Sequence, residues 1–370
     1  MNLLDYVAWR GDLTFNQAPF NEIDNLIFTT FAYLEIGDVL PVKDSDEKVS
    51  IAHVMKDLWE KHDRDEYSIG LIFSDDLLDL ADAMANCERF KNVMISHYIN
   101  HIDLEHEKQF CAMTFHLEVR TAFVAFRGTD DTIVGWKEDF NMCFQTPVPS
   151  QKEAVNYIKW IMTKTKRKLR VGGHSKGGNL AIYGAAFSGI RARKRIIEIY
   201  NNDGPGFTQL VTEKEEYQMI QSMVQTFVPQ SSIIGMLLEH EEEYYVVHST
   251  GVGILQHNPF SWELCGTRFI YDKELSASSK LLDHSLREWI MSVDDTQKEE
   301  FVEGLFQVIS QEEFTFVSEF SIGKISGFFK NYKHMDEATR KLLLSTVKVL
   351  FDATKKHAKD DLFLRVNKQN

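Results

Sequence analysis

The sequence predicts an α/β protein in which helices cover both faces of a mostly parallel sheet. Short β-type runs alternate with helical segments between residues 120 and 248, and strands that alternate with helices form parallel sheets. Because such sheets are buried on both faces, their strands are expected to be apolar, as these runs are. One run ends in a glycine-rich turn that leads directly into a helix rich in small residues. With 370 residues, 44% of them hydrophobic, the chain can build a large core with an appended region.

The N-terminal part of the chain reads as mainly helical. Residues 20–33 begin with asparagine and acidic residues that favour a helix start and continue as an apolar run. Residues 49–60 and 75–87 also have helical periodicity. We therefore expect residues 1–95 to form a helical region that packs on a core domain of residues 96–275.

The core domain begins with two β-rich runs, residues 109–116 and 120–126, whose short separation predicts a hairpin. The elements expected after it are helices at 152–165 and 179–187 and strands at 168–172, 195–200, 223–228 and 243–248. Helical patterns return beyond residue 280, at 297–310 and 337–354. Residues 276–370 are therefore expected to form a C-terminal helical appendage.

Composition narrows the class of protein. A net charge of −14 disfavours nucleic acid and anionic membrane surfaces as partners, because both would repel the chain. The start of the sequence lacks the features of a secretion signal, and no run of about 18 apolar residues predicts stable membrane insertion. The cysteines (Cys87, Cys111, Cys143 and Cys265) are too widely spaced for a metal site or a disulfide framework. A cytoplasmic protein without a metal or cofactor is the simplest interpretation.

Residues 173–177 read Gly-His-Ser-Lys-Gly, which is the G-x-S-x-G pattern of a nucleophile elbow. Such a serine lies in a strained strand-to-helix turn, and the glycines let the strand and the helix approach closely. The turn exposes the hydroxyl of Ser175 and directs a helix N-terminus toward a developing oxyanion. Since a β-type run precedes the pattern and a helical one follows it, we interpret Ser175 as a nucleophile rather than as part of a glycine-rich turn alone.

A histidine that follows the last predicted strand of the core is the expected general base. His257 lies in a loop at this point of the chain, whereas His240 and His248 flank the strand at 243–248. We therefore predict His257 as the base, with a structural loop histidine as the alternative. A neutral imidazole there can accept the serine proton and return it to the leaving group.

Asp203 is the best candidate for the acid that orients this histidine. It follows the strand at 195–200 at the carboxyl edge of the sheet, where sites form in α/β proteins. Residues 203–206 read Asp-Gly-Pro-Gly, which is also good turn chemistry without any catalytic role. Both interpretations of Asp203 stay open at this point.

The oxyanion hole requires two hydrogen-bond donors. The backbone N–H of Lys176, the residue after the nucleophile, is one candidate. Thr129, which follows the strand at 120–126, can offer both a backbone N–H and a hydroxyl. The alternative for this segment is a glycine turn that only ends the strand.

Two sets of residues resemble known families. Residues 126–129, Trp136, Asp139 and the segment 173–178 are similar to the signature of class 3 lipases, the fungal-lipase-like α/β hydrolases. A closer resemblance, over about residues 5–265, is to the bacterial Mbeg-like family of α/β hydrolases, a domain family of unknown function. It is carried by residues 9–12, 20–21, 173–178, 200–207, 256–257 and 261–262. The resemblance implies an α/β-hydrolase fold and, from the lipases, an oxyanion role for Thr129.

The chain departs from the lipase pattern at two positions. Class 3 lipases carry their acid before a Val-Pro pair, but residues 227–232 contain no acidic residue, which leaves Asp203, one strand earlier. Lys176 replaces a residue that is commonly leucine in those lipases. A cation beside the nucleophile argues against a long-chain triglyceride and favours an anionic acyl group, unless Lys176 is simply solvated on the first helical turn.

These observations favour a serine hydrolase that cleaves a carboxylic ester or thioester through an acyl-enzyme on Ser175. The expected substrate is a small-molecule acyl ester or a lipid. A non-catalytic scaffold of the same fold, which binds a ligand or a protein, is the alternative from another class. A serine peptidase or amidase would use the same triad with a different pocket. The sequence leaves the oligomeric state open.

Overall fold

The computed structural model describes residues 1–41, 45–67, 75–117, 120–130, 132–142 and 144–276, together with 279, 294, 296, 298–299 and 302–303. Over these residues it confirms the predicted α/β fold class. The helices expected at 297–310 and 337–354 lie almost wholly or wholly outside the described residues, as does Cys143. The proposed division into three regions stays a prediction.

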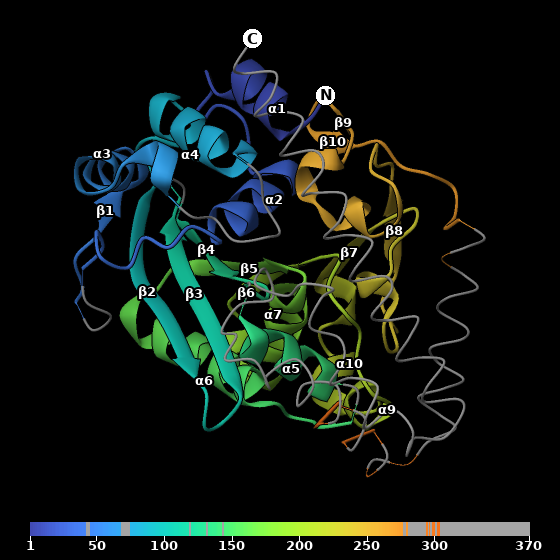
Figure 1. The fold of residues 1–370 in the computed structure, drawn as a ribbon. Helices are drawn as coiled ribbons and strands as arrows, with labels where there is room; N and C mark the ends of the chain where they lie inside the picture. Colours follow the sequence, from blue (N-terminus) through green and yellow to red (C-terminus); the bar gives the residue numbers. More distant parts are fainter. Residues whose placement is uncertain are drawn as a thin grey trace, which may run out of the picture.

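Eight strands form one sheet, and their spatial order is the same as their order in the sequence (Figure 1). The first four strands pair antiparallel, and β4 to β8 pair parallel. A separate two-stranded ribbon follows. The strands are β1 (Val49–Ser50), β2 (Met94–Asp103), β3 (Lys108–His116), β4 (Thr121–Phe126), β5 (Lys168–His174), β6 (Ile196–Asn202), β7 (Val224–Pro229), β8 (Tyr244–Val247), β9 (Leu264–Cys265) and β10 (Arg268–Phe269).

Helices cover both faces of this sheet, as Figure 1 shows. One face carries the N-terminal helices, and the other carries helices from the second half of the described chain. The first group is α1 (Leu3–Arg10), α2 (Glu22–Phe31), α3 (Ile51–Lys61) and α4 (Asp76–Asn86). The second group is α6 (Pro149–Lys164), α7 (Lys176–Phe187), α8 (Ile190–Arg193), α9 (Gln209–Thr212) and α10 (Glu215–Gln218), while α5 (Ile133–Asn141) follows the end of β4.

Alternate residues of each strand supply the two hydrophobic cores. In β3, Met113 and Phe115 pack with the N-terminal helices, whereas Phe110 and Ala112 pack with the opposite group. This period of two is expected of a sheet with both faces buried. It explains why strands such as β3 and β4 contain continuous apolar runs in the sequence.

The antiparallel edge of the sheet is larger than the sequence predicted. The expected hairpin of β3 and β4 is confirmed, but β1 and β2 were not predicted. Val49 was assigned to a helix, yet it pairs with Ile95 of β2, and α3 starts at Ile51. Strand β2 carries several polar residues, and its outer half is exposed, so its apolar pattern is interrupted. A two-residue strand such as β1 depends on its tertiary partner rather than on local propensity.

The parallel strands bring four loops to one edge of the sheet. The carboxyl ends of β4, β5, β6 and β7 point the same way, and the segments that follow them contain Thr129, Ser175, Asp203 and Ser232. Among the described residues, no helix is long and apolar enough to cross a membrane.

Candidate active site

Ser175 occupies a strained turn between β5 and α7. Its backbone has φ 58° and ψ −135°, which is unfavourable for a residue with a side chain. The turn is held by a 2.9 Å hydrogen bond from the Ser175 N–H to the Asn202 carbonyl. Close packing requires the glycines, since a Cβ on Gly173 would lie 2.0 Å from the carbonyl carbon of Gly177. The local geometry is that of the elbow predicted from the sequence.

Asp203 and His257, the predicted acid and base, lie within hydrogen-bonding distance of each other. The Asp203 Oδ2 atom is 2.6 Å from the His257 Nδ1 atom, and the Asp203 side chain is 1% exposed. Asp203 follows β6 directly, and its backbone has a φ of 54°. Its N–H donates to the carbonyl of Phe227 in the next strand, at 2.8 Å. His257 ends a 3-10 turn, Gly253–His257.

The segment after β7 contributes to the same cluster. Ser232 donates a 2.5 Å hydrogen bond to Oδ1 of Asp203, so the two carboxylate oxygens have different partners. A Cβ on Gly235 would lie 2.2 Å from Oδ1 of Asp203. The segment after β7 therefore supplies a serine that holds the carboxylate of the residue that follows β6.

Close contacts also connect Ser175 with the loops that surround it. A Cβ on Gly128 would lie 2.9 Å from Cβ of Ser175, and a Cβ on Gly204 would lie 2.3 Å from its carbonyl oxygen. The ring of His174, the residue before Ser175, has its centroid 4.5 Å from that of His257. The serine, the Asp203 loop, the His257 turn and the segment at Gly128 thus converge.

The two predicted oxyanion donors, Lys176 and Thr129, follow the ends of β5 and β4. Lys176 is the first residue of α7, so its backbone N–H has no acceptor within the helix. Thr129 is buried, and its hydroxyl donates to Oδ2 of Asp139. Burial raises the pKa of Asp139 to about 6, although the charge of Lys176 and the Thr129 hydroxyl favour its ionised form.

The structure corrects the interpretation of the Lys176 side chain. It is 1% exposed, and its Nζ atom lies 3.2 Å from Oε2 of Glu138 and 3.0 Å from the carbonyl of Gln109. Lys176 is therefore neither a solvated lysine nor a free cation for an anionic acyl group. Glu138 also accepts the backbone N–H groups of Gln109 and Ser150, so this ion pair fastens α5 to its neighbours.

The other histidines weighed as bases lie elsewhere. His240 bonds to Glu242 at 2.9 Å near the start of β8. His248 follows β8 and bonds to Asp272 at 2.9 Å. Within the described ranges, no group of three or more histidine, cysteine or acidic side chains is arranged to hold a metal ion.

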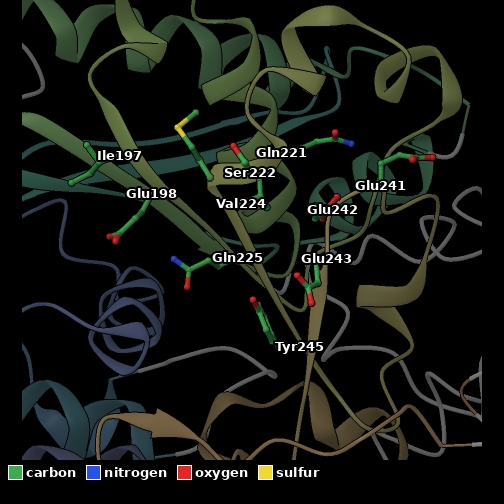
Figure 2. A pocket seen from close by; sticks show the side chains of 11 residues that line it. Ile197, Glu198, Gln221, Ser222, Val224, Gln225, Glu241, Glu242, Glu243 and Tyr245 are labelled. Atoms are coloured by element: carbon green, nitrogen blue, oxygen red, sulfur yellow. The ribbon is translucent and has the colours of Figure 1, made fainter.

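An acidic groove lies at the opposite edge of the sheet from Ser175. Figure 2 shows side chains from the starts of β6, β7 and β8 around it, among them Glu198, Gln225, Glu243 and Tyr245. Because parallel strands begin at this edge, the groove is not continuous with the loops that carry Ser175 and His257.

Sequence reasoning missed two side chains that contact the site. His174 occupies a variable position of the elbow pattern, and it bonds to the backbone of His257. Tyr33 follows α2, and its hydroxyl lies 2.9 Å from Nδ1 of His174. No local signal marks Tyr33, because it meets His174 only through the packing of α2 on the sheet.

The architecture and the serine turn are those of an α/β-hydrolase fold. The chain belongs to the Mbeg1-like family, whose model matches residues 84–307. Comparison with curated protein sequences finds no match.

Solved structures similar to this chain include fungal lipases. A fungal lipase–inhibitor complex shares 17% identity, with 46% of this chain and 68% of that chain covered and a TM-score of 0.32. The Rhizomucor miehei lipase propeptide complex shares 14% identity, with coverage of 49% and 68% and a TM-score of 0.33. A triacylglycerol lipase from Penicillium expansum shares 16% identity, with coverage of 47% and 74% and a TM-score of 0.28.

Proposed function

We propose that the protein is a serine hydrolase that cleaves a carboxylic ester or thioester. The observation that carries the proposal is the hydrogen bond between Asp203 and His257 beside the strained turn of Ser175. A buried carboxylate bonded to Nδ1 keeps the proton there and leaves Nε2 as the acceptor, which is the tautomer that a general base requires.

In the proposed reaction, Ser175 attacks the acyl carbon while His257 takes its hydroxyl proton at Nε2. The backbone N–H groups of Lys176 and Thr129 stabilise the oxyanion. Because the single proton of the Thr129 hydroxyl is donated to Asp139, the backbone N–H of Thr129 is the donor that this site offers. His257 then protonates the leaving group, and water attacks the acyl-enzyme with His257 again as base.

A fluorophosphonate probe tests this proposal, because it phosphonylates only an activated serine. We expect the wild-type protein to be labelled and Ser175→Ala to be unlabelled. Ser188→Ala, at the far end of α7, is the matched control and should be labelled like the wild type. If the folded wild-type protein is not labelled, the binding scaffold considered above becomes the better interpretation.

Esters of p-nitrophenol with increasing acyl length then define the substrate class. Hydrolysis that depends on Ser175 across part of this series supports the ester proposal. Labelling without hydrolysis of any ester or thioester, but with cleavage of an anilide, would instead support the amidase alternative.

A further inference from the structure

The imidazole of His174 bridges three segments of the site. It is fully buried, and its Nε2 atom lies 2.8 Å from the backbone carbonyl oxygen of His257. Its Nδ1 atom lies 2.9 Å from the hydroxyl oxygen of Tyr33. The ring centroids of His174 and His257 lie 4.5 Å apart, and the rings are tilted by 35°. His174 thus contacts His257 through both its ring face and a hydrogen bond.

The partners of His174 determine where its proton resides. A carbonyl oxygen only accepts, so Nε2 must carry the proton that is donated to His257. Burial and the neighbouring His257 lower the pKa of His174 well below its usual range, so the ring is neutral. Nδ1 is therefore an acceptor, and the Tyr33 hydroxyl donates to it. The tautomer is fixed from both sides.

Tyr33 extends this connection to the segment that carries Thr129. The Gly128 backbone lies against the Tyr33 hydroxyl, because a Cβ on Gly128 would lie 2.1 Å from that oxygen. The Tyr33 hydroxyl therefore contacts Gly128 while it donates to His174. A continuous chain of contacts runs from the Gly128 segment through Tyr33 and His174 to the backbone of His257.

We infer that His174 is a positioning residue that holds the backbone of His257 in register with the serine turn and, through Tyr33, with the proposed oxyanion segment. This inference rests on the proposed function. The carboxylate of Asp203 bonds to the imidazole of His257. The imidazole of His174 bonds to the backbone carbonyl of the same residue. With both contacts present, the ring of His257 has a defined position and a defined tilt relative to Ser175.

The expected consequence is an effect on turnover rather than on substrate binding. His174 is fully buried, and its ring nitrogens bond to Tyr33 and to the backbone of His257, so its loss should leave KM near the wild-type value. A displacement of the base by about 1 Å costs on the order of 100-fold in rate. We therefore expect kcat to fall by about 10- to 100-fold when the bond to the His257 carbonyl is removed.

Two substitutions of His174 separate this role from simple packing. A glutamine amide can reach the position of Nε2, so His174→Gln can keep a donor to the His257 carbonyl. An asparagine reaches only the position of Nδ1, so His174→Asn keeps the Tyr33 contact and loses that donor. His116→Asn is the matched control, because His116 is also a buried histidine but ends β3 at the opposite edge of the sheet.

Turnover of a p-nitrophenyl ester and the proton NMR signal of Nδ1–H of His257 are the two readouts. We expect His174→Asn to lower kcat and to broaden or shift this signal, and His174→Gln to recover most of both. His116→Asn should leave both unchanged. Equal loss in the glutamine and asparagine variants, or wild-type turnover and an unchanged signal in His174→Asn, would overturn the inference.

The NMR signal also separates failure of this inference from failure of the proposed function. A wild-type protein that is neither labelled nor active would contradict the hydrolase proposal. The signal of His257 would still report whether its geometry depends on His174, because it requires no substrate. An unchanged signal in the asparagine variant would then count against the positioning role itself.

Discussion

The carboxylate of Asp203 and the imidazole of His257 are joined by a 2.6 Å hydrogen bond across 54 residues of sequence. Neither residue lies in a regular strand. Asp203 is held at a positive φ by its bond to Phe227, and His257 ends a short 3-10 turn. The pairing therefore depends on two loops that the sheet brings together, and both loops are needed for the geometry.

Replacement of Asp203 tests the acid of the proposed triad. Asp203→Asn removes the charge and no longer favours the Nδ1–H tautomer, so kcat should fall by about 10⁴-fold, as for the acid of other serine triads. Ser232→Ala is the control, since it removes the donor to Oδ1 but keeps the carboxylate, and its loss should be much smaller. Steady-state kinetics measures both. Near-wild-type turnover of Asp203→Asn would remove Asp203 from the mechanism.

The sequence predicted those parts of the site that follow from local chemistry. The turn at Ser175 and the place of Asp203 after β6 depend on glycines and strand ends that a local pattern contains. The parallel sheet explains why Asp203 and His257 meet, because strands of one direction end at one edge, but the sequence left open whether Asp203 only forms a turn. In contrast, the burial of Lys176 depends on Glu138, which lies 38 positions away. Nothing in the sequence around Glu138 indicates that it forms an ion pair with Lys176. Strand β2 was missed for a similar reason, because the polar residues Ser96 and His97 interrupt its apolar pattern although both are buried in the sheet.

The Thr129 hydroxyl provides a second prediction. Loss of a full oxyanion donor costs about 10²–10³-fold in turnover. Since the hydroxyl proton is committed to Asp139, Thr129→Val should cost less than this range, with the backbone N–H retained. The measurement is kcat with a p-nitrophenyl ester, with thermal unfolding as the control for folding. A loss within the full range would mean that the hydroxyl leaves Asp139 and binds the oxyanion itself.

The buried ion pair of Lys176 and Glu138 predicts a loss of stability. Their side chains are 1% and 0% exposed, so removing one partner leaves the other charge buried without its counter-ion. Lys176→Met should therefore lower the free energy of unfolding by about 3–5 kcal/mol. The double variant Lys176→Met with Glu138→Gln should lose less than the sum of the two single variants. Urea denaturation measures all three, and strict additivity would contradict a coupled pair.

The last prediction concerns the acid stability of the protein and is independent of the active site. Glu242 lies at the start of β8, next to the groove shown in Figure 2. Burial alone would raise the pKa of its carboxyl. Hydrogen bonds from three side chains, together with the charge of His240, lower the pKa by more than burial raises it. The donors are His240, Tyr217 and Thr226, and they lower the pKa from 4.5 to about 2.

A lowered pKa means that the ionised carboxylate stabilises the fold. This contribution is complete above the unfolded pKa of 4.5 and is lost as the pH falls toward about 2. A shift of this size corresponds to about 3 kcal/mol. Glu242→Gln should therefore be less stable than the wild type near neutral pH, and the difference should shrink as the pH falls through this window. Urea denaturation across the pH range measures it, with exposed Glu243→Gln as the matched control. Parallel pH profiles for Glu242→Gln and the wild type would show that Glu242 is not the group responsible.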